Sequence, residues 1–307
     1  MPYSTENDRT SLLIHLIDSG CKHFLARPTG FGKTAFLDEL EALYRSGAVR
    51  MAPNRILRLD FSKIAFDYDA EVGFQEAFEA FVLRSFEAAG YVDRPETNGV
   101  LLYRIAKWLR DLPVVSLAVL IDNYDTPLIR ALPNPKLYQE ILRELSIFYA
   151  ILKSEDGCQH SVWMTGLTRA AGCDIFDTYN VTVDLTWTPD CAALFGIPNP
   201  NGAYCFDLLG KTRVDAPHKR PEKLTELETI LVDCAFTHAD RSILEPQRLP
   251  LRYVTDTCDV RTIRPEGLLT QLGLLSIQEV DRNESVIVAP ADECAKAILE
   301  QELQQTQ

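Results

Sequence analysis

The chain has 307 residues, which is enough for one large or two medium-sized domains. Apolar residues make up 46% and charged residues 24%, an ordinary balance for a globular protein, and no apolar run approaches the roughly 18 residues that span a bilayer. The net charge of −13 argues against direct nucleic-acid binding as the main activity, because nucleic-acid binders usually carry a basic face.

The first elements frame a glycine-containing loop. Residues 1–8 are polar and lack a secretory pattern, so we expect a cytoplasmic protein with no membrane partner. Residues 10–19 are predicted to form an amphipathic helix, 22–26 a short strand and 33–45 a second amphipathic helix. Gly-Lys-Thr between that strand and helix is the core of a phosphate-binding loop, although a helix start with an exposed lysine is the alternative.

The residue types of the loop suit phosphate chemistry. Gly30 and Gly32 leave room for backbone N–H groups to wrap a phosphate, and the following helix points its positive end at the anion. Lys33 would reach the β- and γ-phosphates, and the Thr34 hydroxyl would coordinate Mg²⁺. Arg27 stands where the usual pattern has its first glycine. The predicted nucleotide-binding residues here are Thr29, Gly30, Phe31, Gly32, Lys33 and Thr34.

The next elements lead to an acidic strand end. Residues 55–62 suit a strand that ends in Asp60 and Ser62, and helices are predicted at 72–89 and 99–112. The apolar run 119–121 reads as a parallel strand that is buried on both faces and ends in Asp122. In phosphate-loop enzymes such an acid supports the Mg²⁺ beside the loop hydroxyl, so we predict Thr34 and Asp122 as the metal ligands. Taken alone, Asp122 could instead open an Asx-turn.

Further strands and helices complete an α/β pattern. Asn134-Pro135 predicts a capped helix that runs to about residue 153. Residues 161–165 read as a strand that ends at Thr165, and 180–185 as another. The repeated strand–helix rhythm predicts an α/β P-loop fold with a mostly parallel sheet covered by helices. Thr165 and Asp122 would then both lie near the phosphate loop.

The C-terminal third divides into two parts. Patterning is weak from 190 to 258, and it sharpens from 264 into a helix at 265–272, strands at 274–280 and 285–289, and a helix at 292–304. This order predicts a small α+β winged-helix-like unit. We therefore divide the chain at 1–198, 199–260 and 261–307. The eight cysteines are scattered without a C-x-x-C pair, which argues against zinc and disulfides.

Several segments resemble the AAA-like ATPase module that often precedes a PD-(D/E)XK nuclease-like domain in bacterial proteins. That family reads Arg-Pro-x-x-Phe-Gly-Lys-[Ser/Thr] at the loop, so Arg27 matches the family's own variant. The resemblance is specific over about 10–198, loose over 199–260 and fair over 261–300. The other matching segments are Leu59–Ser62, Leu120–Pro127, Phe148–Tyr149, Thr165–Arg169, Ile175–Phe176 and Gly273–Leu275.

The resemblance implies ATP and Mg²⁺ as ligands and leaves one position in question. Asn123 stands where the family has a glutamate, and an amide cannot accept a proton from the attacking water. Asp125, two residues further on, is the carboxylate that we expect could replace it. Arg169 lies where related signalling ATPases place a phosphate-sensing arginine; a surface ion pair is the alternative. The chain also ends about where the nuclease-like domain would begin.

Three functions follow from these residues. The first is a regulatory ATPase that binds ATP, hydrolyses it slowly and signals to a protein partner, in a defence or toxin setting that the resemblance suggests. The second is a conventional ATP hydrolase that uses Asp125 or a residue from another subunit of a homo-oligomer. The third is a degenerate adaptor or inhibitor. Acidic residues outnumber basic ones in 261–307, so we expect protein contact there rather than nucleic-acid binding.

Overall fold

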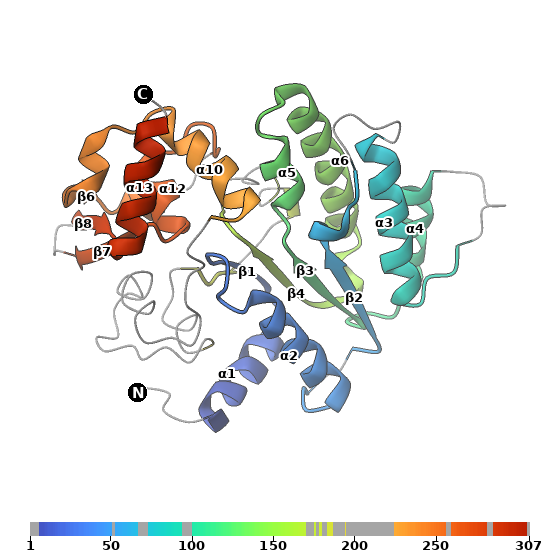
Figure 1. Ribbon diagram of the computed structural model, residues 1–307. Helices are drawn as coiled ribbons and strands as arrows, with labels where there is room; N and C mark the ends of the chain where they lie inside the picture. The colour runs from blue at the N-terminus through green and yellow to red at the C-terminus, as the bar shows by residue number, and fades with distance from the viewer. Residues whose placement is uncertain are drawn as a thin grey trace.

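The computed structural model describes residues 6–50, 53–66, 73–93, 100–169, 175, 178–179, 183–186, 194, 224–255, 259–280 and 285–305. They form a large α/β body and a smaller α+β unit, which lie side by side (Figure 1). None of the helices in these ranges combines the length and the hydropathy that crossing a bilayer requires.

A five-stranded parallel sheet forms the centre of the α/β body. The strand order is β2-β3-β4-β1-β5, and every neighbouring pair is parallel. The predicted α/β fold with a mostly parallel sheet is therefore confirmed. The strands are β1 (Lys22–Ala26), β2 (Arg55–Asp60), β3 (Leu117–Asp122), β4 (Gln159–Gly166) and β5 (Val183–Asp184).

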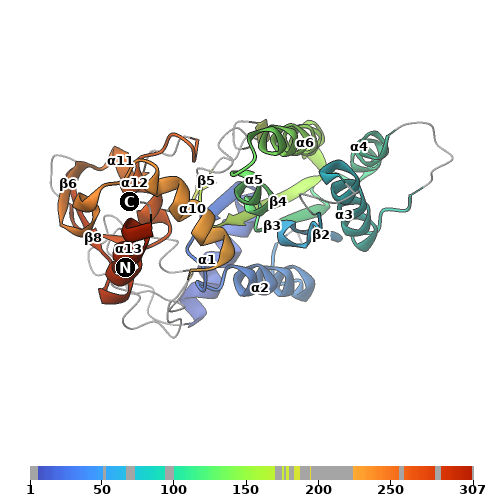
Figure 2. The same cartoon turned by 45° about the horizontal axis from the view of Figure 1, so that its top comes forward.

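Helices cover both faces of this sheet (Figures 1 and 2). Alternate residues of β3 show why, because Val119 and Ile121 join one buried cluster while Ala118 and Leu120 join the other. The second cluster includes α1 (Glu6–Asp18) and α2 (Lys33–Ser46). The helices of the α/β body that contribute to the first cluster are α3 (Phe74–Ala88), α4 (Leu101–Asp111), α5 (Thr126–Ala131) and α6 (Pro135–Ser154).

Local sequence signals set several of these boundaries. Asn134 caps α6 as predicted, since its side chain accepts a hydrogen bond from the Leu137 N–H at 3.2 Å. The predicted strand 55–62 was too long, because Asp60 caps a short 3-10 turn, Phe61–Lys63, that ends the strand. Helix α5 was not predicted. Of the predicted strand 180–185, residues 183–184 pair with β1, and 180–182 lie outside the described residues.

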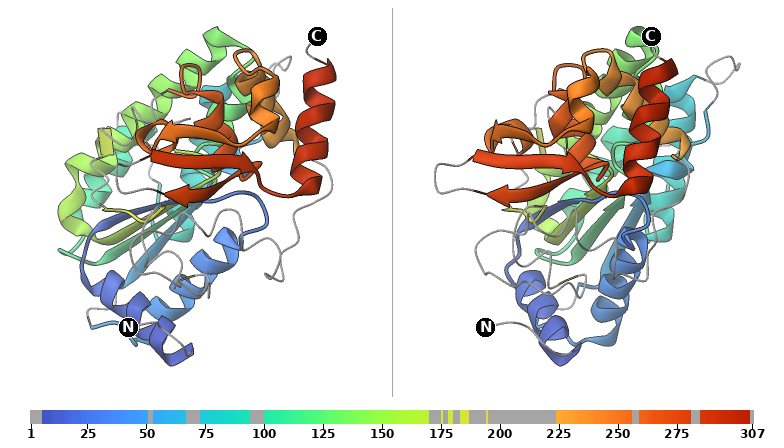
Figure 3. Two further views of the ribbon diagram at one scale, coloured as in Figure 1. Left: turned by 90° about the vertical axis from the view of Figure 1, so that its left-hand side faces the viewer. Right: turned by 60° about the vertical axis from the view of Figure 1, so that its left-hand side comes forward.

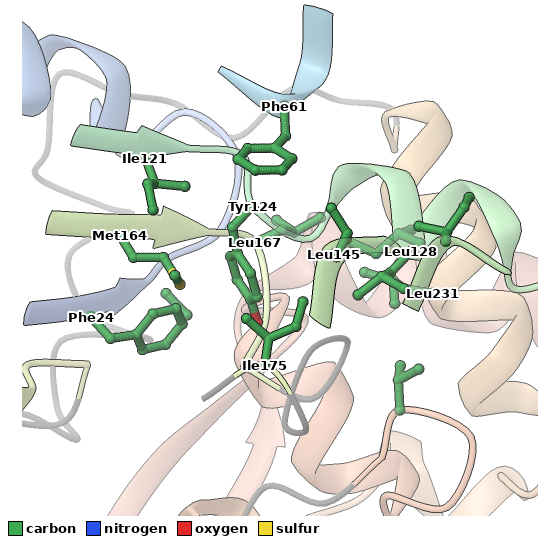
Figure 4. Packing of buried hydrophobic residues seen from close by; sticks show 14 of the residues in the cluster. Phe24, Phe61, Ile121, Tyr124, Leu128, Leu145, Met164, Leu167, Ile175 and Leu231 are labelled. Atoms are coloured by element: carbon green, nitrogen blue, oxygen red, sulfur yellow. The ribbon is translucent and has the colours of Figure 1, made fainter. Parts of the chain in front are cut away.

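The phenylalanines of α3 belong to the core, as the sequence analysis expected. Phe74 and Phe78 stack at 5.5 Å, and Phe78 meets Phe148 of α6 edge-on at the same distance. Phe61, Tyr124 and Leu128 continue this cluster toward the C-terminal unit (Figure 4).

The smaller unit contains a three-stranded antiparallel sheet in the order β6-β8-β7 (Figure 3). The helix α12, the β7–β8 hairpin and the last helix α13 were predicted. Strand β6 and helix α10 were not, and both come from residues 199–260. The bounds are α10 (Glu226–Phe236), β6 (Gln247–Pro250), α11 (Arg252–Thr255), α12 (Pro265–Gln271), β7 (Leu275–Val280), β8 (Ser285–Pro290) and α13 (Glu293–Gln305).

The two bodies share one buried cluster. Leu231 of α10 is fully buried in the same cluster as Leu128 of α5 (Figure 4). On the surface of that contact, Arg130 of α5 lies 3.8 Å from the Glu226 carboxylate of α10. The C-terminal unit is therefore fixed against the helices that follow the acidic strand end.

Candidate nucleotide-binding site

The loop between β1 and α2 depends on its glycines for backbone conformation. Gly30 has φ 86° and Gly32 has φ 74°, in the left-handed region that favours glycine. An added Cβ at either position would meet nothing within 4 Å, so conformation rather than space requires glycine here. Gly32 then begins α2 by accepting a hydrogen bond from the Phe36 N–H at 2.8 Å.

Lys33 folds back onto the loop. Its Nζ donates to the carbonyl oxygens of Arg27 at 2.7 Å and Pro28 at 3.1 Å. Burial lowers the pKa of Lys33, and the charges of Asp125, Asp122 and Glu228 only partly oppose this effect. The ammonium group is therefore held inside the loop, where a phosphate would lie.

Two predicted site residues, Thr34 and Thr165, meet at a third, Asp122, which is fully buried. The Thr34 hydroxyl donates to Asp122 Oδ2 at 2.8 Å, and the Thr165 hydroxyl donates to Asp122 Oδ1 at 2.7 Å. These side chains come from α2, β3 and β4, so the fold brings together residues that are 88 and 43 positions apart.

A hydroxyl and a carboxylate are the hard oxygen ligands that Mg²⁺ takes beside substrate phosphates, so Thr34 and Asp122 fit this metal. Such a site needs few protein ligands. The described residues contain no cluster of three or more His, Cys, Asp or Glu side chains suited to a metal.

Arg58 of β2 is a site residue that the sequence analysis missed. Its guanidinium lies 3.5 Å from Asp122 Oδ2 and 3.3 Å from Asp38 Oδ1 of α2. The Arg58 NH1 atom is buried and has no hydrogen-bond partner in the described structure. An arginine within an apolar strand, two residues before Asp60 and therefore on the same face, was the available sequence signal.

Arg27 ties the start of the loop to the end of β4 and to the segment that follows β5. Its side chain is only 2% exposed, and its NH1 donates to the Thr186 carbonyl at 2.7 Å. Its backbone N–H donates to Gly166 at the end of β4 at 3.2 Å. The residue that replaces the usual first glycine is thus a buried tether of the loop.

Asp125 binds backbone groups of the segment that follows β4. Its Oδ2 accepts from the N–H groups of Leu167 and Thr168, both at 2.8 Å. Burial raises the pKa of Asp125 to about 6, although the Thr168 N–H and the Lys33 charge act against it. Gly166 lies directly before this segment. A Cβ at Gly166 would lie 2.3 Å from the Tyr124 ring, so the close approach of Tyr124 to the backbone here requires glycine.

Arg169 takes part in an ion pair. Its Nε lies 3.0 Å from Asp184 Oδ2, and about a third of each side chain is exposed. This is the surface pairing that the sequence analysis held as the alternative. The predicted phosphate-sensing role stays a prediction.

The C-terminal unit reaches this site through Gln271 of α12. Its Oε1 accepts from the Thr168 hydroxyl at 2.5 Å and from the Arg169 N–H at 3.1 Å. Tyr124 holds the same segment from the other side, because its hydroxyl donates to the Thr168 carbonyl at 2.7 Å. The segment after β4 is therefore held by both bodies, which no local sequence pattern indicated.

Asn123 turns toward the neighbouring strand. Its φ of 53° places it in the left-handed region, which asparagine tolerates better than most residues. Its amide donates to Asp60 Oδ1 at the end of β2 at 3.0 Å. Asp60 and Asp122 are direct partners in the β2–β3 register, so their carboxylates leave the same edge of the sheet.

Known proteins share sequence similarity with this chain. Among curated proteins, an uncharacterized protein in the vnfD 5' region of Azotobacter chroococcum mcd 1 is 24% identical over 205 residues. The aligned region covers 62% of this chain but only 39% of that relative. The family model described as predicted AAA-ATPase matches residues 7–176, which is more than half of the chain. The chain therefore belongs to the predicted AAA-ATPase family.

Proposed function

We propose that this protein is a Mg²⁺-dependent ATP-binding switch that hydrolyses ATP slowly and signals to a protein partner. The observation that carries the proposal is the convergence of Thr34 and Thr165 on Asp122, beside the loop that holds Lys33. In this role Lys33 binds the β- and γ-phosphates, and Thr34 and Asp122 hold Mg²⁺, which neutralises phosphate charge when bound.

Slow hydrolysis follows from the residue after the metal carboxylate. Asn123 donates its amide to Asp60 and has no group that takes a proton from water. A positioned general base commonly contributes about 10²–10⁴-fold to such reactions. A ligand that is bound but rarely consumed stabilises the conformation that binds it.

The signalling part of the proposal concerns the C-terminal unit. Gln271 of that unit binds the segment after β4, and Glu228 of α10 acts electrostatically on Lys33. A change at the phosphates would therefore act on contacts between the two bodies. The acidic balance of residues 261–307 favours a protein partner over nucleic acid. A cytoplasmic location, homo-oligomerisation and a defence or toxin setting belong to the same proposal.

Calorimetry with ATP tests the binding half. Lys33→Ala removes the main side-chain contact to the phosphates and should weaken Mg²⁺-dependent ATP binding at least about 10-fold, the loss of one charge-assisted hydrogen bond or more. Arg45→Ala is the control, because Arg45 pairs with Glu41 on the exposed side of the same helix. Equal affinity in wild type and Lys33→Ala contradicts the site assignment.

A conventional hydrolase that uses Asp125 is the second candidate. Burial raises the pKa of Asp125 to about 6, which is near the pH at which a general base works well. Turnover of several ATP per second that is abolished by Asp125→Asn would establish this alternative. A protein that binds no ATP would instead be an adaptor.

A further inference from the structure

The carboxyl end of β2 supplies a carboxylate beside the position where glutamate is missing. Asp60 is the last residue of β2, and Asn123 is the first residue after β3. The Asn123 amide donates to Asp60 Oδ1 at 3.0 Å. The carboxylate and the amide are thus neighbours on adjacent strands.

The backbone conformation at Asn123, and not only its side-chain rotamer, orients the Asn123 amide toward Asp60. Asn123 and Val115 are the two non-glycine residues with positive φ in the described part of the chain. The left-handed turn at Asn123 changes the chain direction directly after β3, so that its side chain points back to β2. A strained backbone conformation of this kind persists only where the surrounding contacts hold it in place.

Asp60 is held in place by one of its oxygens. Its Oδ1 accepts from the Ser62 N–H at 3.2 Å and from the Ser62 hydroxyl at 2.6 Å, in addition to Asn123. Its Oδ2 lies 3.4 Å from Nζ of Lys63, whose side chain is 74% exposed. One oxygen therefore fixes the carboxylate, while the other is paired only with a surface lysine among the described contacts.

Asp60 is also charged and within reach of water. Burial raises its pKa, but hydrogen bonds from Ser62 and Asn123 and the charge of Lys63 together lower it below the ordinary value. Its side chain is 15% exposed. An ionised carboxylate of this kind accepts hydrogen bonds from water.

The other two carboxylates near this sheet edge, Asp122 and Asp125, are buried and hydrogen-bonded. Both oxygens of Asp122 accept from threonine hydroxyls, at 2.8 Å and 2.7 Å. Asp125 Oδ2 accepts two backbone N–H groups, and only 1% of the residue is exposed. Asp60, whose side chain is 15% exposed, is the carboxylate of these three that water reaches in the described structure.

We infer that the Asp60 carboxylate binds the attacking water in the slow ATP hydrolysis proposed above, and that the Asn123 amide positions this carboxylate. The inference rests on the proposed function. The water oxygen forms a bond to the γ-phosphorus, and the bond from that phosphorus to the β–γ bridging oxygen breaks. ADP leaves with the electron pair of that bond. The water proton passes to Asp60 Oδ2 and then to solvent.

Exchanging the two side chains tests the inference. Asp60→Asn removes the charge but keeps an oxygen that accepts from Ser62 and Asn123, so the fold should be retained. We expect kcat to fall about 10²-fold, the lower end of general-base effects, with the ATP dissociation constant unchanged. The double variant Asp60→Asn/Asn123→Glu keeps one amide and one carboxylate in exchanged positions and should regain wild-type turnover or exceed it.

Asp240→Asn is the matched control. Asp240 caps a short 3-10 turn through the Ser242 N–H at 2.7 Å, as Asp60 does with Ser62, but it lies in the C-terminal unit. A purely structural role predicts similar changes in melting temperature and turnover for both variants, whereas a catalytic role predicts lost turnover for Asp60→Asn alone.

The outcomes separate this inference from the proposed function. Unchanged turnover in Asp60→Asn, a double variant no faster than Asp60→Asn, or no measurable turnover in wild type would each overturn the role of Asp60 while ATP binding stands. Absence of ATP binding in the wild type would instead overturn the proposed function itself.

Discussion

Replacing Asp125 should separate a structural role from a catalytic one. In Asp125→Ala, the backbone N–H groups of Leu167 and Thr168 lose the oxygen that both now reach at 2.8 Å. Both residues are buried, so water cannot readily replace that oxygen. A buried unsatisfied donor costs about 1–3 kcal/mol, which gives about 2–6 kcal/mol for the pair. That is a large part of the roughly 5–15 kcal/mol that stabilises a typical domain.

Asp125→Asn is the paired variant, because it keeps an acceptor oxygen and removes only the charge. It should lose less than half as much stability as Asp125→Ala. Denaturant unfolding of the full chain at pH 7 measures both free energies of unfolding, and hydrogen exchange at the Leu167 and Thr168 amides locates the effect. Since the inference above assigns the water to Asp60, ATP turnover should survive in Asp125→Asn.

A loss below about 1 kcal/mol in Asp125→Ala, with both amides still protected from exchange, would refute the structural role derived from these hydrogen bonds. Loss of turnover in a stable Asp125→Asn would refute the catalytic assignment and favour the conventional hydrolase.

Three further outcomes are expected. Burial raises the pKa of Asp125 from its ordinary value of 3.8 to about 6. Because the folded protein keeps this proton to higher pH than the unfolded chain does, its free energy of unfolding should fall by up to about 3 kcal/mol as pH rises from about 4 to 7. If the free energy of unfolding of Asp125→Asn falls with pH as steeply as that of the wild type, this prediction is wrong. Arg169→Ala should narrow the difference between ATP and ADP affinity, and an unchanged ratio by calorimetry would leave Arg169 as the ion-pair partner of Asp184 only. Gln271→Ala removes the oxygen that accepts from the Arg169 N–H and the Thr168 hydroxyl, so it should lower the free energy of unfolding by about 1–3 kcal/mol and reduce any ATP-induced hydrogen-exchange protection of α12. Full protection of α12 in the variant would argue against coupling through this side chain.

Much of the fold could be predicted because its signals are local. The apolar run 22–26 gave both bounds of β1, and the Asn134-Pro135 pair gave the start of α6. Strand β6 was missed because it has four residues and forms at the edge of a sheet through pairing with β8, 35 or more positions away. Helix α10 lies within a region of weak patterning, and its cap at Thr225 was overlooked.

The site divides in the same way. Lys33, Thr34 and Asp122 could be named from the sequence because phosphate binding requires particular residue types at particular strand ends. The roles of Arg58 and Gln271 depend on which residues the tertiary fold places beside them, so their own neighbours in sequence say little. Asp125 shows the difference most clearly, since the sequence identifies a carboxylate near the site but not the two backbone N–H groups that it accepts.

The inward-folded Lys33 has a consequence for selectivity. Its ammonium group already has two carbonyl partners, at 2.7 Å and 3.1 Å, so an arriving anion must displace them rather than meet an unpaired cation. Any anion that binds Lys33 breaks the same two hydrogen bonds from the lysine to the loop carbonyls. Only a chain of phosphates long enough to contact both the lysine and the loop N–H groups forms more hydrogen bonds than are broken. The carbonyls of Arg27 and Pro28 therefore act as built-in competitors that raise the affinity threshold against single phosphates and leave nucleotides with longer phosphate chains favoured.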